Sequence, residues 1–276
     1  MGNRKFSIHF WGTRGAVSSP TRQSVKYGGN TSCVEVQCGE RTLILDAGTG
    51  FRLLGLDLQE RKITDLDLFF THFHYDHICG LPFFAPLYNP ECKMRIWSGH
   101  LDRDNATRES IKDYMVHPFF PVGPEVFKAK IEHKDFSAGD DLAPGDNIEI
   151  KTCTLNHPGG ATGYRINFDG RSFCYITDTE HSSDGLDEAI LQLIEGADMM
   201  VYDATYSDSE YPNFIDFGHS TWEQGIRLCK AANVDKFGLF HHRPSRTDEK
   251  LDSIVQEAKL VFPGSFATRD GLKIEL

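Results

Sequence analysis

The feature that most constrains this chain is the segment THFHYDH at positions 71–77, which directly follows an apolar stretch. His72 and His74 are two residues apart, so in extended backbone they project to the same side and can hold one metal ion. Asp76 and His77, where we expect the chain to turn into a helix, can hold a second ion. If these polar groups were ordinary core side chains they would be buried without partners, which is costly. The segment therefore predicts a metal site.

The remaining metal ligands are expected where later strands end. Imidazole nitrogen and carboxylate oxygen suit Zn²⁺, Mn²⁺ or Fe²⁺ much better than Ca²⁺. A single ion needs a third protein ligand, and two ions need a bridging one. Open α/β sheets place such groups where strands run out into loops. Candidates in that position are His157, Asp178 and the adjacent pair His241 and His242.

The hydrophobic pattern predicts one α/β domain over residues 1–276. Apolar segments between turns predict strands at Lys5–Trp11, Cys33–Cys38, Thr42–Asp46, Leu66–Thr71, Arg95–Ser98, Val126–His133, Ile148–Leu155, Thr162–Phe168 and Arg171–Thr177. Beyond residue 180 helices alternate with strands, at Leu186–Ile194 (helix), Met199–Tyr202 (strand), Ser220 to about Ala232 (helix), Phe237–Phe240 (strand) and a last helix opened by Ser245 and Asp248.

Residues 100–125 are the least regular part of the sequence. They hold one short amphipathic helix, Arg103–Met115, followed by the segment HPFFP at 117–121. An apolar, proline-rich loop of this kind is more typical of a lid or a dimer contact than of a core. We therefore expect an insertion that closes over the site or joins two copies in a homodimer.

Charge and composition narrow the partners. The chain has 29 Lys and Arg against 40 Asp and Glu, a net charge of −11. Such a surface repels phosphate backbones on average, so long nucleic acid is a less expected partner than a small molecule. No apolar run approaches the ~20 residues that span a bilayer, so we expect a cytoplasmic protein that does not enter membranes. The seven cysteines, without a CxxC pair, indicate reduced and mostly buried thiols.

The order of the candidate ligands resembles that of the metallo-β-lactamase superfamily over nearly the whole chain, from the segment LILDAG at 43–48 to His241. The resemblance implies a four-layered αβ/βα sandwich and two divalent metal ions, Zn or Mn, with Fe as a further option. It implies one ion on His72, His74 and His157, a second on Asp76, His77 and His241, and Asp178 as the bridge. We favour His241 over His242 because His241 directly follows the strand.

Further segments resemble one branch of that superfamily. The segment FGHST at 217–221 is similar to the Gly-His-Ser-Thr segment of ribonuclease Z and related phosphodiesterases, where this His lies near the scissile phosphate. The segments GYRI at 163–166 and DATY at 203–206 resemble the same branch. We therefore predict His219 and Asp76 as catalytic residues, and expect Asp203 to orient a ligand or His219. The alternative for His219 is a residue that caps a helix or bonds a neighbouring carboxylate.

The predicted substrate contacts lie beside these residues. Backbone N–H groups at a helix start favour an anion, and arginines can pair with phosphate oxygens as bidentate donors. On that basis the substrate-binding residues are expected to be Ser220, Thr221, Arg243 and Arg246, although arginines near a helix start are also often only solvated. The turn GTRG at 12–15 can cradle a phosphate or be no more than a turn, and Phe119, Phe120 and Tyr206 are candidates to stack on a base.

Together these features predict a metal-dependent hydrolase, most simply a phosphodiesterase for a small phosphodiester such as a cyclic nucleotide. A hydroxide bridging two ions would attack phosphorus in line, and His219 would protonate or stabilise the leaving oxygen. No basic Gly/Pro-rich insertion that would grip RNA lies between Thr177 and His219. The alternatives are a ribonuclease Z-like RNA 3′-end endonuclease, a hydrolase of a non-phosphate ester, thioester or lactone, and, least expected, a metal-binding protein without turnover.

Overall fold

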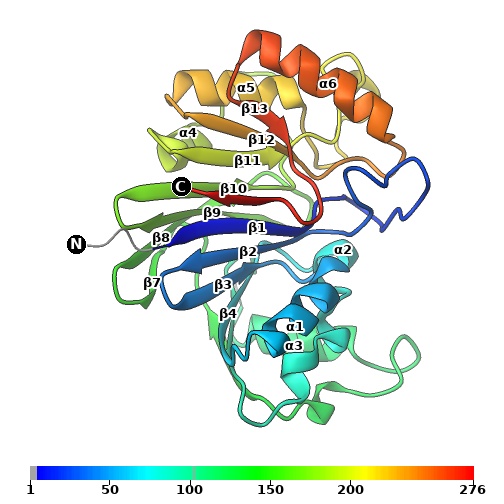
Figure 1. Ribbon diagram of the computed structural model, residues 1–276, viewed down its shortest axis with the longest axis vertical. Coiled ribbons are helices and arrows are strands. Elements are labelled where there is room, and N and C mark those ends of the chain that lie inside the picture. Colours follow the sequence, from blue (N-terminus) through cyan, green and yellow to red (C-terminus); the bar gives the residue numbers. More distant parts are fainter. Residues whose placement is uncertain (1–4, 102) are drawn as a thin grey trace.

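The computed structural model describes residues 5–101 and 103–276. Two seven-stranded sheets face each other, and helices cover the outer face of each one (Figure 1). The packing between the sheets combines aliphatic and aromatic side chains. The ring centroids of Phe69 and Tyr164 lie 5.9 Å apart, and those of Phe10 and Phe240 lie 6.3 Å apart, each pair taking one ring from each sheet. The predicted four-layered αβ/βα sandwich is confirmed.

The first sheet has the spatial order β14-β1-β2-β3-β4-β5-β6. Its strands are β1 (Phe6–Gly12), β2 (Cys33–Cys38), β3 (Arg41–Leu45), β4 (Asp65–Phe70), β5 (Lys93–Ser98), β6 (Lys130–Asp135) and β14 (Lys273–Glu275). Strands β3 to β6 run parallel to one another. The helices that follow these strands are α1 (Gly50–Glu60), the short α2 (Tyr75–Ile78) and α3 (Ala106–Tyr114).

The second sheet has the order β13-β12-β11-β10-β9-β8-β7. Its strands are β7 (Asp141–Gly145), β8 (Ile148–Leu155), β9 (Ala161–Phe168), β10 (Arg171–Ile176), β11 (Met199–Asp203), β12 (Lys236–Phe240) and β13 (Ser265–Ala267). Its outer face is covered by α4 (Glu188–Ile194), α5 (Trp222–Ala231) and α6 (Asp248–Val261), as Figure 1 shows.

The directions of the strands place several loops at one edge of the sandwich. Strands β10, β11 and β12 are parallel, so their carboxyl ends lie at the same edge. Strand β8 runs the same way, because β8 and β10 are both antiparallel to β9. In the first sheet, β3 and β4 are parallel and also end side by side. Loops that are far apart in the sequence therefore gather where these strands end.

Helix α1 is absent from the sequence-based prediction. Its buried residues Phe51, Leu54 and Leu58 follow helical spacing, but Gly50 and Gly55 lower its intrinsic helix propensity. Tertiary packing explains Gly55, because a Cβ atom there would lie 2.8 Å from the Phe84 ring. Close contact with the turn beneath it, rather than intrinsic helix propensity, thus explains why helix α1 forms here.

Other element boundaries differ from the prediction for local reasons. Strand β6 begins at Lys130 rather than residue 126, because Pro124–Val126 form a single 3₁₀ turn. The cap of α5 is Thr221, whose side chain accepts from the Gln224 N–H, and not Ser220. Likewise Thr247, rather than Ser245, caps α6. The short strands β7, β13 and β14 were not predicted.

Two negative expectations can be compared with the structure. Among the described residues, no helix combines the length and the apolar character needed to cross a membrane. All seven cysteines are free and buried, as the absence of a CxxC pair indicated.

We predict that the buried carboxylate of Asp67 in β4 contributes strongly to stability. Asp67 is fully buried and accepts from Arg95 Nε at 2.6 Å and Trp97 Nε1 at 3.1 Å, and it also pairs with Arg41. Asp67→Ala leaves both guanidinium groups short of an acceptor, so the free energy of unfolding should fall by about 3 kcal/mol in urea denaturation. The control is Asp65→Ala, since Asp65 pairs with the same arginines but is 51% exposed. It should cost less than about 1 kcal/mol, and equal losses would contradict the prediction.

Candidate metal centre

The structure brings all seven predicted metal ligands into one cluster at the edge of the sandwich. They come from the loop after β4, from α2, and from the first residues after β8, β10 and β12: His72, His74, Asp76, His77, His157, Asp178 and His241. All but His74 are buried. Ligands separated by up to 169 positions in the printed sequence thus converge because their strands end at the same edge.

Their donor atoms form two triads with Asp178 between them. One donor each from His72, His74 and His157 lie within 4.8 Å of one another, and so do donors of Asp76, His77 and His241. Asp178 Oδ1 lies 3.9 Å from both His72 Nε2 and His157 Nε2, in the first triad. It also lies 3.3 Å from His241 Nε2, and Asp178 Oδ2 lies 3.2 Å from His77 Nε2, in the second triad. The carboxylate therefore contacts both sets of imidazoles.

The cluster fits divalent metal ions. His72 Nε2 and His77 Nε2 are buried and have no hydrogen-bond partner in the described part of the chain. A buried nitrogen of this kind is costly unless something binds it. Since the surrounding groups are imidazoles and carboxylates, a divalent cation that coordinates nitrogen and oxygen ligands would satisfy these atoms.

Protonation in the cluster also suits metal binding. Burial, together with the charge of His77, lowers the pKa of His72 well below its ordinary value, and burial likewise lowers the pKa of His74 and His157. These imidazoles are therefore neutral, the form that binds a metal. Burial by itself would raise the pKa of Asp178, but the imidazoles of His241 and His77 outweigh it and hold this pKa well below its usual range.

Several ligands are held in orientation by a second hydrogen bond. His77 Nδ1 lies 2.8 Å from Asp46 Oδ2, which also accepts from Tyr175 Oη at 3.0 Å. His157 Nδ1 donates to the Gly218 carbonyl at 2.7 Å. Such bonds fix the ring and direct Nε2 towards the cluster. Sequence reasoning missed Asp46, although an acid directly after a buried strand is the signal that also identified Asp178.

The structure separates the two adjacent histidines after β12. His241 has a positive φ of 58° and turns its ring into the cluster. His242 points into the core instead, where its Nε2 donates to the Thr268 carbonyl at 2.8 Å. The structure thus brings His241, and not His242, into the cluster.

The segment at 12–15 packs against the second triad. A Cβ atom on Gly15 would lie 2.3 Å from the His241 ring, and the Ala16 N–H donates to Asp76 Oδ2 at 2.7 Å. The fully buried Arg14 donates to the carbonyls of Arg246 at 2.7 Å and Arg243 at 3.2 Å. The glycine serves close backbone packing, and the turn holds the loop after β12 in place. Sequence reasoning did not assign this role to Arg14.

His219 lies at the edge of the cluster, paired with Asp203. Its Nδ1 lies 2.8 Å from Asp203 Oδ2, and its ring centroid lies 4.9 Å from that of His241. Burial disfavours a charged ring, but Asp203 outweighs this and raises the pKa of His219 to about 9. With a 16% exposed side chain against 1% for His241, His219 is the more accessible of the two imidazoles.

Three predicted substrate contacts are occupied by protein partners. Ser220 is fully buried, and its Oγ bonds Tyr202 Oη at 2.9 Å and His181 Nδ1 at 2.7 Å. Thr221 caps α5 and donates to Asp208. Arg246 is buried in an ion pair with Glu210 at 2.6 Å. This corrects the expectation that these side chains face an open site, because tertiary partners use their polar groups.

The other predicted contacts are more varied. Arg243 is 34% exposed, and its guanidinium lies over the Phe214 ring at 4.6 Å. Tyr206 is buried with one face stacked on Phe214 at 4.4 Å, so that face is not open to a base. Phe119 is 85% exposed, whereas Phe120 packs edge-on against Phe83. Arg243 is thus the predicted substrate contact that stays partly exposed, with a loose ion pair to Glu210 at 4.0 Å.

Comparison with known proteins agrees with this geometry. The family model described as "Beta-lactamase superfamily domain" matches residues 41–242. Ribonuclease Z of Oceanobacillus iheyensis is 25% identical over 313 residues, which cover 95% of this chain and 97% of the relative. Ribonuclease Z of Exiguobacterium sp. is 26% identical over 308 residues, covering 96% and 98%.

Solved structures share the fold. The metallo-β-lactamase fold protein YhfI from Bacillus subtilis has a TM-score of 0.74 and 18% identity, covering 99% of this chain and 100% of its own. A diphosphatase from the PhnP family has a TM-score of 0.72 and 18% identity, with 98% of both chains covered. The short form of human tRNase Z has a TM-score of 0.67 and 20% identity, covering 97% and 98%.

We predict that His241 and His242 differ sharply in their effect on metal binding. His241→Ala removes a nitrogen of the second triad, so the purified variant should lose metal on dialysis that the parent protein retains. His242→Asn keeps a donor near the Thr268 carbonyl and should retain the parental metal content. Elemental analysis after dialysis measures both, and a reversed pattern would show that the ligand has been assigned to the wrong histidine.

We also predict that Asp46 tunes metal affinity without contacting the ion. Asp46→Asn weakens the hold on His77 Nδ1, so metal affinity should fall by about 10–100-fold in a competition assay with a coloured chelator. Asp57→Asn, a half-buried acid on α1 that pairs with Arg61, is the matched control and should leave affinity unchanged. A parental affinity in Asp46→Asn would contradict the role of this hydrogen bond.

Proposed function

The chain belongs to the β-lactamase superfamily, and on that premise we propose that it is a metal-dependent hydrolase of small phosphodiesters. The observation that carries the proposal is the pair of His219 and Asp203, which lies against a cluster able to hold two ions. Ions at the two triads supply Lewis acidity that activates water and offsets the charge of phosphate oxygens. The identity of the ions is proposed as Zn or Mn, with His72, His74 and His157 on one and Asp76, His77 and His241 on the other.

His219 is proposed as the group that gives a proton to the leaving oxygen. Its Nδ1 is engaged by Asp203 at 2.8 Å, while its Nε2 has no hydrogen-bond partner among the described residues. Asp203 stabilises the charged ring, so a proton at Nε2 is available near neutral pH. An acid beside the ions is what a phosphodiester needs, since its alkoxide leaving group is a poor one without protonation.

Arg243 is proposed to bind a non-bridging phosphate oxygen. Its guanidinium lies 4.6 Å from the centre of the Phe214 ring and 5.7 Å from that of Tyr206. Stacking on aromatic rings orients the planar guanidinium and reduces the freedom that it loses when it binds an anion. The residue therefore offers a directed positive charge over Tyr206, whose ring centroid lies 6.2 Å from that of His219.

A small substrate is favoured by two features. The net charge of −11 opposes the approach of a long polyanion. The alignment with ribonuclease Z of Oceanobacillus iheyensis spans 313 positions against 276 residues here, so that relative holds segments that this chain lacks. In this chain the residues between His157 and Asp178 form only the hairpin of β9 and β10.

Processing of RNA 3′ ends is the second candidate. It is favoured by the curated relatives, since those described above are named ribonuclease Z and cover at least 95% of this chain. The two candidates share their metal chemistry and differ in how much substrate surface the protein must grip. Affinity for a long RNA would fall steeply with salt, whereas turnover of a small diester would not.

The decisive experiment assays the metal-loaded protein against bis(p-nitrophenyl) phosphate, cyclic nucleotides, precursor tRNA, nitrocefin, a thioester and a lactone. We expect turnover of the small phosphodiesters. Salt-sensitive cleavage of precursor tRNA with no turnover of cyclic nucleotides would favour the second candidate. Equal or faster turnover of nitrocefin, the thioester or the lactone would overturn the assignment to phosphodiesters.

His219→Asn tests the proposed acid. It should lower kcat on a cyclic nucleotide by about 10²–10⁴-fold while leaving metal content unchanged, because His219 Nδ1 is engaged by Asp203 and both triads keep their donors. The matched control is His9→Asn on β1, whose ring packs against Trp11 away from the cluster. It should retain parental kcat. A His219→Asn enzyme with parental kcat would rule out proton donation by this residue.

A further inference from the structure

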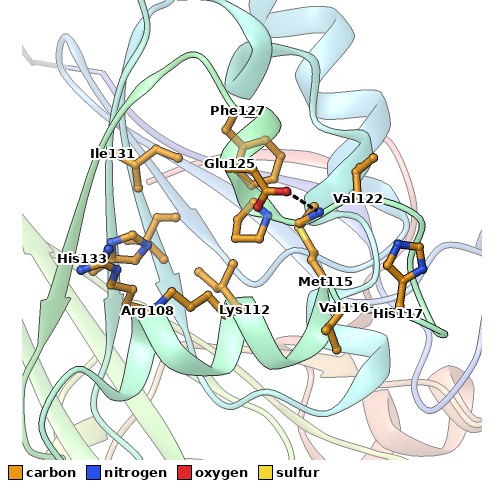
Figure 2. A pocket seen from close by; sticks show the side chains of 14 residues that line it. Arg108, Lys112, Met115, Val116, His117, Val122, Glu125, Phe127, Ile131 and His133 are labelled. Carbon is orange, nitrogen blue, oxygen red and sulfur yellow. Dashed lines mark hydrogen bonds between the residues drawn. The ribbon is translucent and has the colours of Figure 1, made fainter.

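A cavity of about 570 Å³ lies under α3, beside strands β5 and β6 at one edge of the first sheet. Figure 2 shows it between α3, strand β6 and the loop around Val122 and Glu125. None of its lining residues belongs to the metal cluster. Its volume is within the range of sites that bind small molecules. The cavity is therefore a separate candidate site.

The floor of this cavity is apolar. Ile96, Ile111 and Met115 line it and are at most 2% exposed, and Phe127 and Ile131 complete the wall. Water gains few hydrogen bonds against such a surface, so a ligand with an apolar body would displace it favourably.

The rim carries one cation without a partner. Lys112 is already paired with Glu109 at 2.8 Å, and Glu125 accepts from the Gly123 N–H at 3.1 Å. Arg108 has no ion pair or hydrogen bond with any residue that the structure describes. Its guanidinium lies beside His133 in Figure 2, projecting from α3 towards β6. Burial and the charge of Arg108 lower the pKa of His133, so this imidazole is neutral and adds no second charge.

We propose that this cavity binds a monoanionic amphiphile of the medium-chain carboxylate class. The apolar chain would lie among Ile111, Phe127 and Ile131, and the carboxylate would accept bidentate hydrogen bonds from Arg108. A single free guanidinium matches one negative charge, whereas a phosphate dianion would call for a second free cation. The proposal does not depend on the reaction at the metal centre.

Titration of the full-length protein with decanoate, followed by calorimetry, tests the proposal. We expect saturable binding of one decanoate per chain, much weaker binding of 1-decanol, which lacks the charge, and none of acetate, which lacks the chain. Arg108→Met should weaken decanoate binding by about tenfold or more, because it removes a hydrogen bond to a charged group. Arg52→Met, an exposed arginine on α1, is the matched control and should bind like the parent protein.

A second variant tests the chain-binding part of the cavity. Val122 lines the cavity and is 41% exposed, so Val122→Trp should reduce the space without disturbing the core. We expect it to weaken decanoate binding at unchanged thermal stability. No saturable binding by the parent protein, or equal binding by the Arg108→Met and Arg52→Met variants, would overturn the proposal. So would a change in sedimentation with Val122→Trp in a protein that ignores decanoate, since the cavity would then be an interface between two copies.

Discussion

The structure depends on a set of buried metal-binding groups that satisfy one another only in part. His72 Nε2 and His77 Nε2 have no hydrogen-bond partner among the described residues. Asp178 lies between them, and its charge is stabilised by imidazoles and by the Thr177 hydroxyl, which donates to Oδ2 at 2.6 Å. Polar groups in such a position lower the stability of the fold unless a cation binds them. Metal binding therefore offsets the free-energy cost of burying them at this edge of the sandwich. The parallel strands of both sheets matter for the same reason. Only a fold that ends β4, β8, β10 and β12 at one edge can bring these donors within reach of one another.

The parts of the site that could be predicted are those with a local signature. The segment at 71–77 places its donors by spacing alone, and His157, Asp178 and His241 each follow a strand that the hydrophobic pattern reveals. The layers of the fold were implied by the resemblance of the ligand order to a known superfamily. For the ligands, the information lies within a few residues of the position concerned.

The parts that could not be predicted depend on contacts between distant segments. Asp46 and Arg14 act through residues 31 and 232 positions away, and nothing in their neighbourhoods identifies those partners. Ser220 and Arg246 were expected to meet substrate because of their residue types, yet His181 and Glu210 occupy their polar groups. Helix α1 was missed because packing against Phe84 overrides its glycines. Tertiary partners, which a single sequence does not display, decide all of these cases.

The contacts that Arg14 and Ala16 make with the second triad and the loop after β12 also determine when the metal centre can be completed during synthesis. The Ala16 amide supports Asp76, and Gly15 donates to the His242 carbonyl, so the second triad has one wall from the start of the chain and one from its last third. While the ribosome is still adding β12, a nascent chain holds only the ligands that precede it, and His241 is missing. His72, His74 and His157 all precede β12, so the first triad can form at that stage, but the complete centre is a late product of long-range closure. Acquisition of the full metal complement therefore reports that the two halves of the sandwich have docked.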